Sequence, residues 1–157
     1  MLHISVIAVG KLKEKFWAQA CDEYLKRLRP YAAVDVRELP DIDPAKAGGE
    51  AKAVRQESDA VLAAIPEGSV AFLLDICGKL VTSEDIAQAI DDCSLSGSSR
   101  LCFIVGGSCG VDERVRAKVQ RRISLGRITL PHNLARVVLL EQLYRAFKIS
   151  RNEPYHK

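Results

Sequence analysis

Residues 101–110 read LCFIVGGSCG, an apolar run that ends in a cluster of glycines. The run is rich in β-branched and aromatic residues, which predicts a buried strand from Leu101 to Val105. Gly106, Gly107 and Gly110 follow at once, and glycines in this place let a ligand approach the backbone and present free amides. The spacing is neither the dinucleotide fingerprint G-x-G-x-x-G nor a P-loop, so taken alone it is equally typical of a plain tight turn.

Strand-like and helix-like segments alternate along the rest of the chain. Apolar runs predict further strands at residues 2–9, 34–39, 70–75 and 123–130. Apolar residues at helical spacing predict helices at residues 13–28, 51–65, 112–122 and 133–149, and Thr82 or Ser83 caps another. Residues 40–49 are rich in turn formers, and we expect a flexible loop there. The alternation predicts an α/β fold with a mainly parallel sheet and helices on both faces.

The composition favours one folded unit. The chain has 157 residues, of which 48% are hydrophobic and 27% charged, so it can bury a core. It shows no internal repeat, and we expect a single domain over residues 1–157. No apolar run reaches about 18 residues, the length of a membrane span. Residues 2–9 lack the charged leader of a secretory signal, so we expect a cytoplasmic protein.

Five cysteines and three histidines are present, and none of them falls at metal-ligand spacing. There is no C-x-x-C pair, and the odd number argues against a disulfide scaffold. We therefore expect no metal, and we expect each cysteine to act as a small buried hydrophobic residue.

The charge is distributed unevenly. Residues 1–111 hold 12 basic and 16 acidic side chains, a net −4, whereas residues 112–157 hold 11 basic and 4 acidic ones, a net +7. A basic segment of this kind favours an anionic partner, although a solvated charged face explains it equally well.

Ligands of open parallel sheets bind beyond the carboxyl ends of the strands, which directs attention to residues 74–79, 105–110 and 124–132. Asp75 could bind a hydroxyl group or cap a turn. Lys79 could hold a phosphate or be merely exposed. His132 follows Pro131 at a helix start, where a neutral imidazole is favoured either as a base or as a cap.

The last helix and the tail carry further candidates. Arg136 and Arg145 suit phosphate or carboxylate recognition, or else form a solvated face. The tail, residues 152–157, ends in an aromatic residue, an imidazole and a cation instead of small polar residues. Either it takes part in binding or it is a frayed end.

Several blocks resemble one known family. They are LDxxGK at residues 74–79, GGxxG at 106–110, LPHxLARV at 130–137 running into LEQLYRA at 140–146, and PYHK at 154–157. Together with VGKLK at residues 9–13 they are similar to the ribosomal large-subunit methyltransferase H family of the SPOUT class. The resemblance covers essentially the whole chain. Two departures are Cys77 in the variable part of the first block and Ser108-Cys109 in place of a proline-containing pair.

The resemblance implies an S-adenosylmethionine-dependent enzyme. In that family the enzyme methylates N3 of a pseudouridine in a 23S rRNA hairpin on the assembled 70S ribosome, as a homodimer with a composite site. A C-terminal trefoil knot is also implied, against the general rule that chains are unknotted. By position, the cofactor contacts fall on Leu74, Gly106, Ser124, Leu125, Gly126, Arg127, Ile128 and Thr129, with Leu130 adjacent.

Methyl transfer from a sulfonium is an in-line displacement, so positioning should dominate catalysis. We expect Arg136, His132, Tyr155 and His156 to orient the pyrimidine and ease its deprotonation, and the pattern does not single out the base. Val137, Leu140 and Tyr144 lie off the inward stripe of the last helix and favour a dimer contact. Two other classes stay open: a non-enzymatic RNA-binding module and a flavodoxin-like nucleotide or flavin protein.

Overall fold

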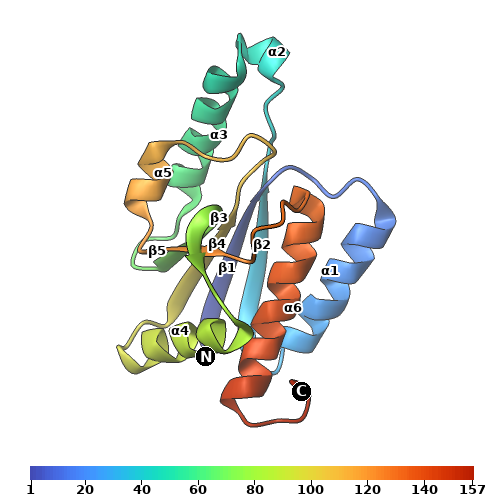
Figure 1. Cartoon of the computed structure of the whole chain (residues 1–157), viewed down its shortest axis with the longest axis vertical. Helices are drawn as coiled ribbons and strands as arrows, with labels where there is room; N and C mark the ends of the chain where they lie inside the picture. Colours follow the sequence, from blue (N-terminus) through green and yellow to red (C-terminus); the bar gives the residue numbers. More distant parts are fainter.

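Five parallel strands form one sheet in the computed structural model, which describes all 157 residues (Figure 1). The strands are β1 (Leu2–Val9), β2 (Ala32–Leu39), β3 (Val70–Leu80), β4 (Arg100–Val105) and β5 (Arg121–Ser124). They lie in the order β2-β1-β4-β3-β5, and every pairing between them is parallel. The predicted α/β fold is confirmed.

Helices cover both faces of this sheet, as the sequence predicts. They are α1 (Lys15–Leu28), α2 (Pro44–Ala47), α3 (Glu50–Ala64), α4 (Ser83–Leu95), α5 (Glu113–Lys118) and α6 (His132–Ser150). Side chains of α1, α4 and α6 share one core cluster with the sheet, and those of α3 and α5 share the other. The trefoil knot stays an expectation from the family resemblance. None of the helices combines the length and apolarity that a bilayer crossing requires.

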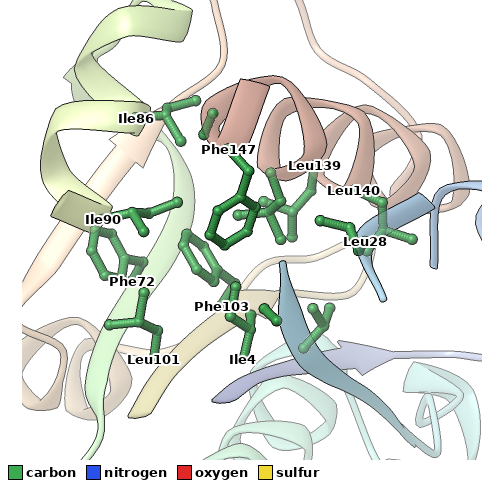
Figure 2. Packing of buried hydrophobic residues seen from close by; sticks show 14 of the residues in the cluster. Ile4, Leu28, Phe72, Ile86, Ile90, Leu101, Phe103, Leu139, Leu140 and Phe147 are labelled. Carbon is green, nitrogen blue, oxygen red and sulfur yellow. The ribbon is translucent and has the colours of Figure 1, made fainter. Parts of the chain in front are cut away.

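The larger core cluster lies between the sheet and α6. The rings of Phe72 on β3 and Phe103 on β4 stack with their centroids 4.7 Å apart, and both are almost fully buried. Figure 2 shows them facing Phe147 and Leu139 of α6. Leu140, which the sequence places on an outer face, is buried in this cluster, so that expectation is wrong.

Several elements differ from the sequence predictions. β3 does not stop at Asp75: its pairing with β5 breaks after Leu74 and resumes at Lys79, and the strand runs on to Leu80. Residues 40–49 are not a plain loop, because Asp43 caps the short helix α2 by accepting a hydrogen bond from the Ala45 amide at 3.0 Å.

The basic helix expected at residues 112–122 is α5, which ends at Lys118. Gln120 pairs instead with β3: its backbone amide donates to the Ala71 carbonyl at 3.1 Å, and its side-chain oxygen accepts from the Ala71 amide at 2.7 Å. β5 takes up residues 121–124 and ends there, well before the expected residue 130. Pairing with a distant strand has overridden local helical periodicity.

A buried arginine fastens α6 to the ends of β1 and β2. The Arg136 side chain is only 2% exposed. Its Nη1 donates to Glu38 Oε2 at 2.6 Å, and its Nη2 donates to the Gly10 carbonyl at 2.9 Å. The same Glu38 oxygen accepts the Leu12 amide at 3.2 Å. We call this set of contacts the Arg136 clasp.

The clasp controls the ionisation of Glu38. Burial raises the pKa of Glu38, but the hydrogen bonds from Arg136 and the Leu12 amide outweigh burial and hold the net pKa below the ordinary value of 4.5. The ionised form is thus the one that the fold stabilises. A carboxylate whose folded-state pKa is lowered stabilises the fold above its ordinary pKa, and that contribution is lost as the pH falls through the folded-state pKa.

Truncating the stacked ring at Phe72 should destabilise the chain strongly. Phe72→Ala removes a buried aromatic side chain and leaves a cavity, so we expect a loss of about 3–5 kcal/mol in the free energy of unfolding. Leu95→Ala is the control, because Leu95 is 85% exposed and its truncation should change stability by less than about 0.5 kcal/mol. Urea denaturation of both variants measures the difference, and equal losses would contradict the described core.

Arg136→Met should cost about 2 kcal/mol of stability at neutral pH, because two hydrogen bonds involving a charged group are lost. The loss stays moderate because Glu38, with 36% of its side chain exposed, can be hydrated in the variant. The difference from wild type should shrink between about pH 7 and about pH 3 as Glu38 becomes protonated. Denaturation at several pH values tests this, and a difference that grows on acidification would refute the ion pair.

Candidate functional site

A cavity of about 720 Å³ opens at the carboxyl edge of the sheet, beside β3, β4 and β5. Three segments far apart in the sequence form most of its lining: residues 73–76, residues 105–111 except Cys109, and residues 123–132 except Ser124 and Arg127. Arg116 and Ala135 complete the lining. These coincide largely with the segments expected to bind a ligand. The volume lies within the range of about 300–1,000 Å³ typical of small-molecule sites.

The first wall is the bulge of β3. Leu74, Asp75 and Ile76 line the cavity. The Asp75 carboxylate accepts from Arg116 Nε on α5 at 3.3 Å and lies 3.8 Å from Arg122 Nε on β5. Its other oxygen accepts the Cys77 amide at 3.0 Å, the turn-capping contact that the sequence allows. Asp75 thus ties α5 and β5 to β3 beneath the cavity.

Gly78 and Lys79 end the LDxxGK block of residues 74–79 but do not line the cavity. A Cβ at Gly78 would lie 2.8 Å from the Arg122 carbonyl carbon, so only glycine allows β5 to pass this close. Lys79 resumes the pairing with Ile123 and lines a different hollow, under α4. The structure therefore does not place Lys79 in the cavity.

The glycine loop after β4 forms the second wall. Gly106, Gly107, Ser108 and Gly110 all line the cavity. The Gly110 amide donates to the Gly107 carbonyl at 3.0 Å, and Gly110 has a φ of +78°, which favours glycine. This hydrogen bond closes the turn at the position where Ser108 and Cys109 replace the proline-containing pair.

Helix α3 supports this loop from behind. The Glu57 side chain is almost fully buried, and a Cβ at Gly107 would lie only 3.1 Å from its Oε1. Glu57 Oε2 accepts the Ile42 amide at 2.8 Å, and Ser58 accepts the Asp112 amide at 2.9 Å. Neither Glu57 nor Ser58 is among the site residues predicted from the sequence. Their place on the inward stripe of the helix, between Val54 and Val61, is the signal that could have found them.

The third wall follows β5. Leu125, Gly126, Ile128, Thr129 and Leu130 line the cavity. Ser124 and Arg127, which the resemblance also assigns to the cofactor, are not on its lining. Ser124 instead shapes the turn, because its hydroxyl donates to the Gly126 carbonyl at 2.8 Å.

His132 lies at the mouth of the cavity as the first residue of α6. Its ring packs against Gly10, where a Cβ would lie 3.4 Å from His132 Nε2. Arg136, one turn further on, does not line the cavity. The expectation of a solvated arginine is wrong there, because the guanidinium is buried in the clasp and its Nε has no partner.

The tail is not frayed but packs on the other end of α6. The Tyr155 hydroxyl donates to Glu141 Oε1 at 3.2 Å, and the Arg145 guanidinium lies 4.6 Å from the centroid of the Tyr155 ring. Burial raises the pKa of Tyr155, and the nearby Glu141 carboxylate raises it further. The phenol is therefore a proton donor at neutral pH and not a ready base.

His156 also belongs to this second group. Its Nε2 lies 2.7 Å from Glu84 Oε1, and its Nδ1 lies 3.3 Å from Arg145 Nη1. Thirteen residues of α6 separate His132 from Arg145, roughly 20 Å at 1.5 Å per residue. Figure 1 shows both chain termini at the end of the molecule opposite to the carboxyl edge of the sheet. The predicted catalytic residues are thus split between two ends of one protomer.

The cysteines divide into two classes. Cys21, Cys93 and Cys102 are buried, and burial raises the pKa of the Cys102 thiol to about 12. Cys77 and Cys109 are exposed, so for these two the expectation of burial is wrong. No three or more His, Cys, Asp or Glu side chains gather where they could hold a metal ion.

Comparison with known proteins places this geometry in a family. A family model described as "Predicted SPOUT methyltransferase" matches residues 2–156. The chain is 45% identical to the ribosomal RNA large subunit methyltransferase H of Pelotomaculum thermopropionicum, with 99% of each protein covered. It is 44% identical to that of Desulforamulus reducens over 100% of both, and 45% identical to that of Listeria monocytogenes over 99% of this chain and 100% of the relative. The chain therefore belongs to the SPOUT methyltransferase family and is a methyl-transferring enzyme.

Proposed function

We propose that the chain, acting as one domain over residues 1–157, methylates N3 of a pseudouridine in a hairpin of 23S rRNA on the assembled 70S ribosome, with S-adenosylmethionine as donor. The observation that carries the proposal is the 720 Å³ cavity, which is built from the blocks that carry the family resemblance. The ribosomal substrate is supported by the names of full-length relatives that are about 45% identical. The acceptor atom, the hairpin and the 70S particle follow from the family resemblance.

The residues of the cavity fit S-adenosylmethionine. Half of the residues that line it are hydrophobic, which suits the adenine ring, and Gly106 and Gly126 leave backbone groups accessible. We assign the contacts with the donor to Leu74, Gly106, Leu125, Gly126, Ile128 and Thr129, and not to Arg127, which lies off the lining. Ser124 acts indirectly, by shaping the turn at Gly126. When bound, S-adenosylmethionine supplies a methyl group on a positively charged sulfonium.

The remaining work falls to residues that orient the acceptor base and take its imide proton. His132 lies on the cavity and can contact the base. Arg136 is buried away from the cavity, so we assign it a positioning role through Gly10, which packs against His132. Tyr155 can donate a hydrogen bond to the pyrimidine, and His156 can hydrogen-bond it or accept a proton.

A homodimer can bring Tyr155 and His156 of one protomer to the cavity of the other. The tail of a protomer lies roughly 20 Å from its own cavity by the length of α6. Tyr155 and His156 can therefore act on a bound base only if they come from a second copy of the chain. This separation supports the composite site that the family resemblance implies.

Gly106→Val should abolish the binding of S-adenosylmethionine with only a modest loss of stability. The backbone at Gly106 is not in the left-handed region, and the nearest atom to an added Cβ is Val111 Cγ1 at 3.3 Å, so the chain can still fold. The larger side chain occupies cavity space instead. Calorimetric titration measures the affinity. The control is Cys93→Ser, at a buried position of α4 outside the cavity, which should bind and react normally. Unchanged affinity of a folded Gly106→Val would place the donor elsewhere.

Deleting residues 155–157 should reduce methyl transfer to 70S ribosomes at least about a hundredfold, or about 2.7 kcal/mol of transition-state stabilisation. The affinity for S-adenosylmethionine should be retained and the melting temperature little changed, because no residue of 155–157 belongs to either core cluster. Labelled S-adenosylmethionine provides the assay, with free subunits as the comparison substrate. Full activity of the truncated chain would remove Tyr155 and His156 from the site.

Mixing the two inactive variants tests the dimer directly. A heterodimer of the truncated chain with Gly106→Val contains one intact cavity facing one intact tail. Random exchange of subunits should therefore restore about a quarter of wild-type activity. A mixture that stays inactive after proven exchange, or a wild type that sediments as a monomer at micromolar concentration, would contradict the composite site.

A further inference from the structure

The connection between β1 and α1 presents an unusual surface beside the cavity. Residues 11–17 read KLKEKFW. Every second residue from 11 to 15 is a lysine, and the aromatic pair Phe16 and Trp17 follows. Lys11, Lys13 and Lys15 are exposed, and none of them forms an ion pair in the structure. Phe16 is 61% exposed and lies against Trp17, with ring centroids 5.1 Å apart. We call residues 11–17 the basic aromatic segment.

The backbone at the start of this segment is held in place, although its lysine side chains form no ion pairs. Gly10, with a φ of +102°, turns the chain away from β1, and its amide donates to the Leu39 carbonyl at 2.7 Å. The Leu12 amide is fixed by Glu38, and the Leu12 side chain packs on the larger core cluster. The Arg136 clasp therefore fixes the backbone from which the lysines and Phe16 project, which lowers the entropy cost of binding a partner.

The segment also adjoins the reaction site. Gly10, immediately before it, packs against His132 at the cavity mouth. β1 is hydrogen-bonded to β4, so the segment and the glycine loop leave the sheet at the same edge. Figure 1 shows the β1–α1 connection passing close to the start of α6. A polymer whose target base lies in the cavity would extend over this surface.

We propose that the basic aromatic segment is an RNA-docking surface, in which Phe16 stacks on an unpaired nucleobase flanking the target and Lys13 and Lys15 contact phosphates. The proposal rests on the proposed function, because it is the RNA substrate that brings a hairpin loop to the cavity. An exposed aromatic ring next to cations suits single-stranded nucleic acid, because the ring can stack on a base while the lysines neutralise the backbone. An acidic protein offers no planar base for the ring, and a contact between two copies of this segment would bring like charges together.

Phe16→Ala should weaken the binding of 70S ribosomes roughly tenfold, because one base–aromatic stack is lost. The KM for ribosomes should rise by the same factor, with kcat and the affinity for S-adenosylmethionine unchanged. Phe16→Trp should restore binding, which a merely structural role would not require. Leu95→Ala, which truncates an exposed leucine on α4, is the matched control. Unchanged binding by Phe16→Ala would overturn the proposal.

The contribution of Lys13 and Lys15 is measured separately, through the salt dependence of ribosome binding. The double variant Lys13→Gln, Lys15→Gln should flatten the dependence of log binding constant on log salt by about 1.4, if each lysine meets one phosphate of unpaired RNA. The control Lys46→Gln, Lys52→Gln removes the same charge from exposed sites on α2 and α3 and should leave the slope unchanged. Equal slopes for the two double variants would remove Lys13 and Lys15 from the surface.

Two further outcomes are distinguishable. If Phe16→Ala sediments as a monomer while wild type is a dimer, the segment is a subunit contact and the RNA proposal is wrong. If wild type binds ribosomes but does not methylate them, the proposed function is wrong. The ribosome-binding measurements on the Phe16 and lysine variants still decide whether this segment contacts RNA.

Discussion

The buried guanidinium of Arg136 is the interaction on which the carboxyl edge of this protein depends. A buried charge is tolerated only when it is paired, so Arg136 requires Glu38 at the end of β2 and the Gly10 carbonyl at the end of β1 in fixed places. One side chain of α6 thereby sets the spacing between two strands and the last helix. His132 lies one turn earlier on α6 and lines the cavity. Its ring packs against Gly10, so the contacts of Arg136 also fix the position of His132.

The glycines of the family blocks do two different kinds of work. Gly78 and Gly107 are required by packing: a Cβ would collide with the β5 backbone in one case and press on Glu57 and Val9 in the other. Gly106 and Gly126 line the cavity and leave its backbone accessible. A motif of glycines therefore encodes both a close approach of protein to protein and a close approach of ligand to protein, and only the structure separates the two.

Local patterns predicted the strands, their parallel pairing and the three segments that meet at the cavity, since apolar periodicity and turn residues act over short distances. Contacts between distant residues decided what the sequence could not show. The end of α5 depends on Gln120 pairing with Ala71, and the burial of Arg136 depends on Glu38, which lies 98 positions away. Likewise, nothing local reveals that Tyr155 packs on Glu141 at the end of α6 away from the cavity.

Net charge along the sequence and accessible charge on the fold also differ. Part of the basic charge of residues 112–157 is neutralised within the protein. Six of its eleven cations form ion pairs with carboxylates, namely Arg114, Arg116, Arg122, Arg136, Arg145 and Lys148. The unpaired lysines of residues 11–15 lie instead in the part of the chain that is acidic overall. An anionic partner responds to charges that are exposed and unpaired, because paired charges are already screened by their neighbours. The charge count by segment therefore indicates the C-terminal part of the chain alone, whereas the fold also leaves unpaired lysines next to the cavity, in residues 11–15.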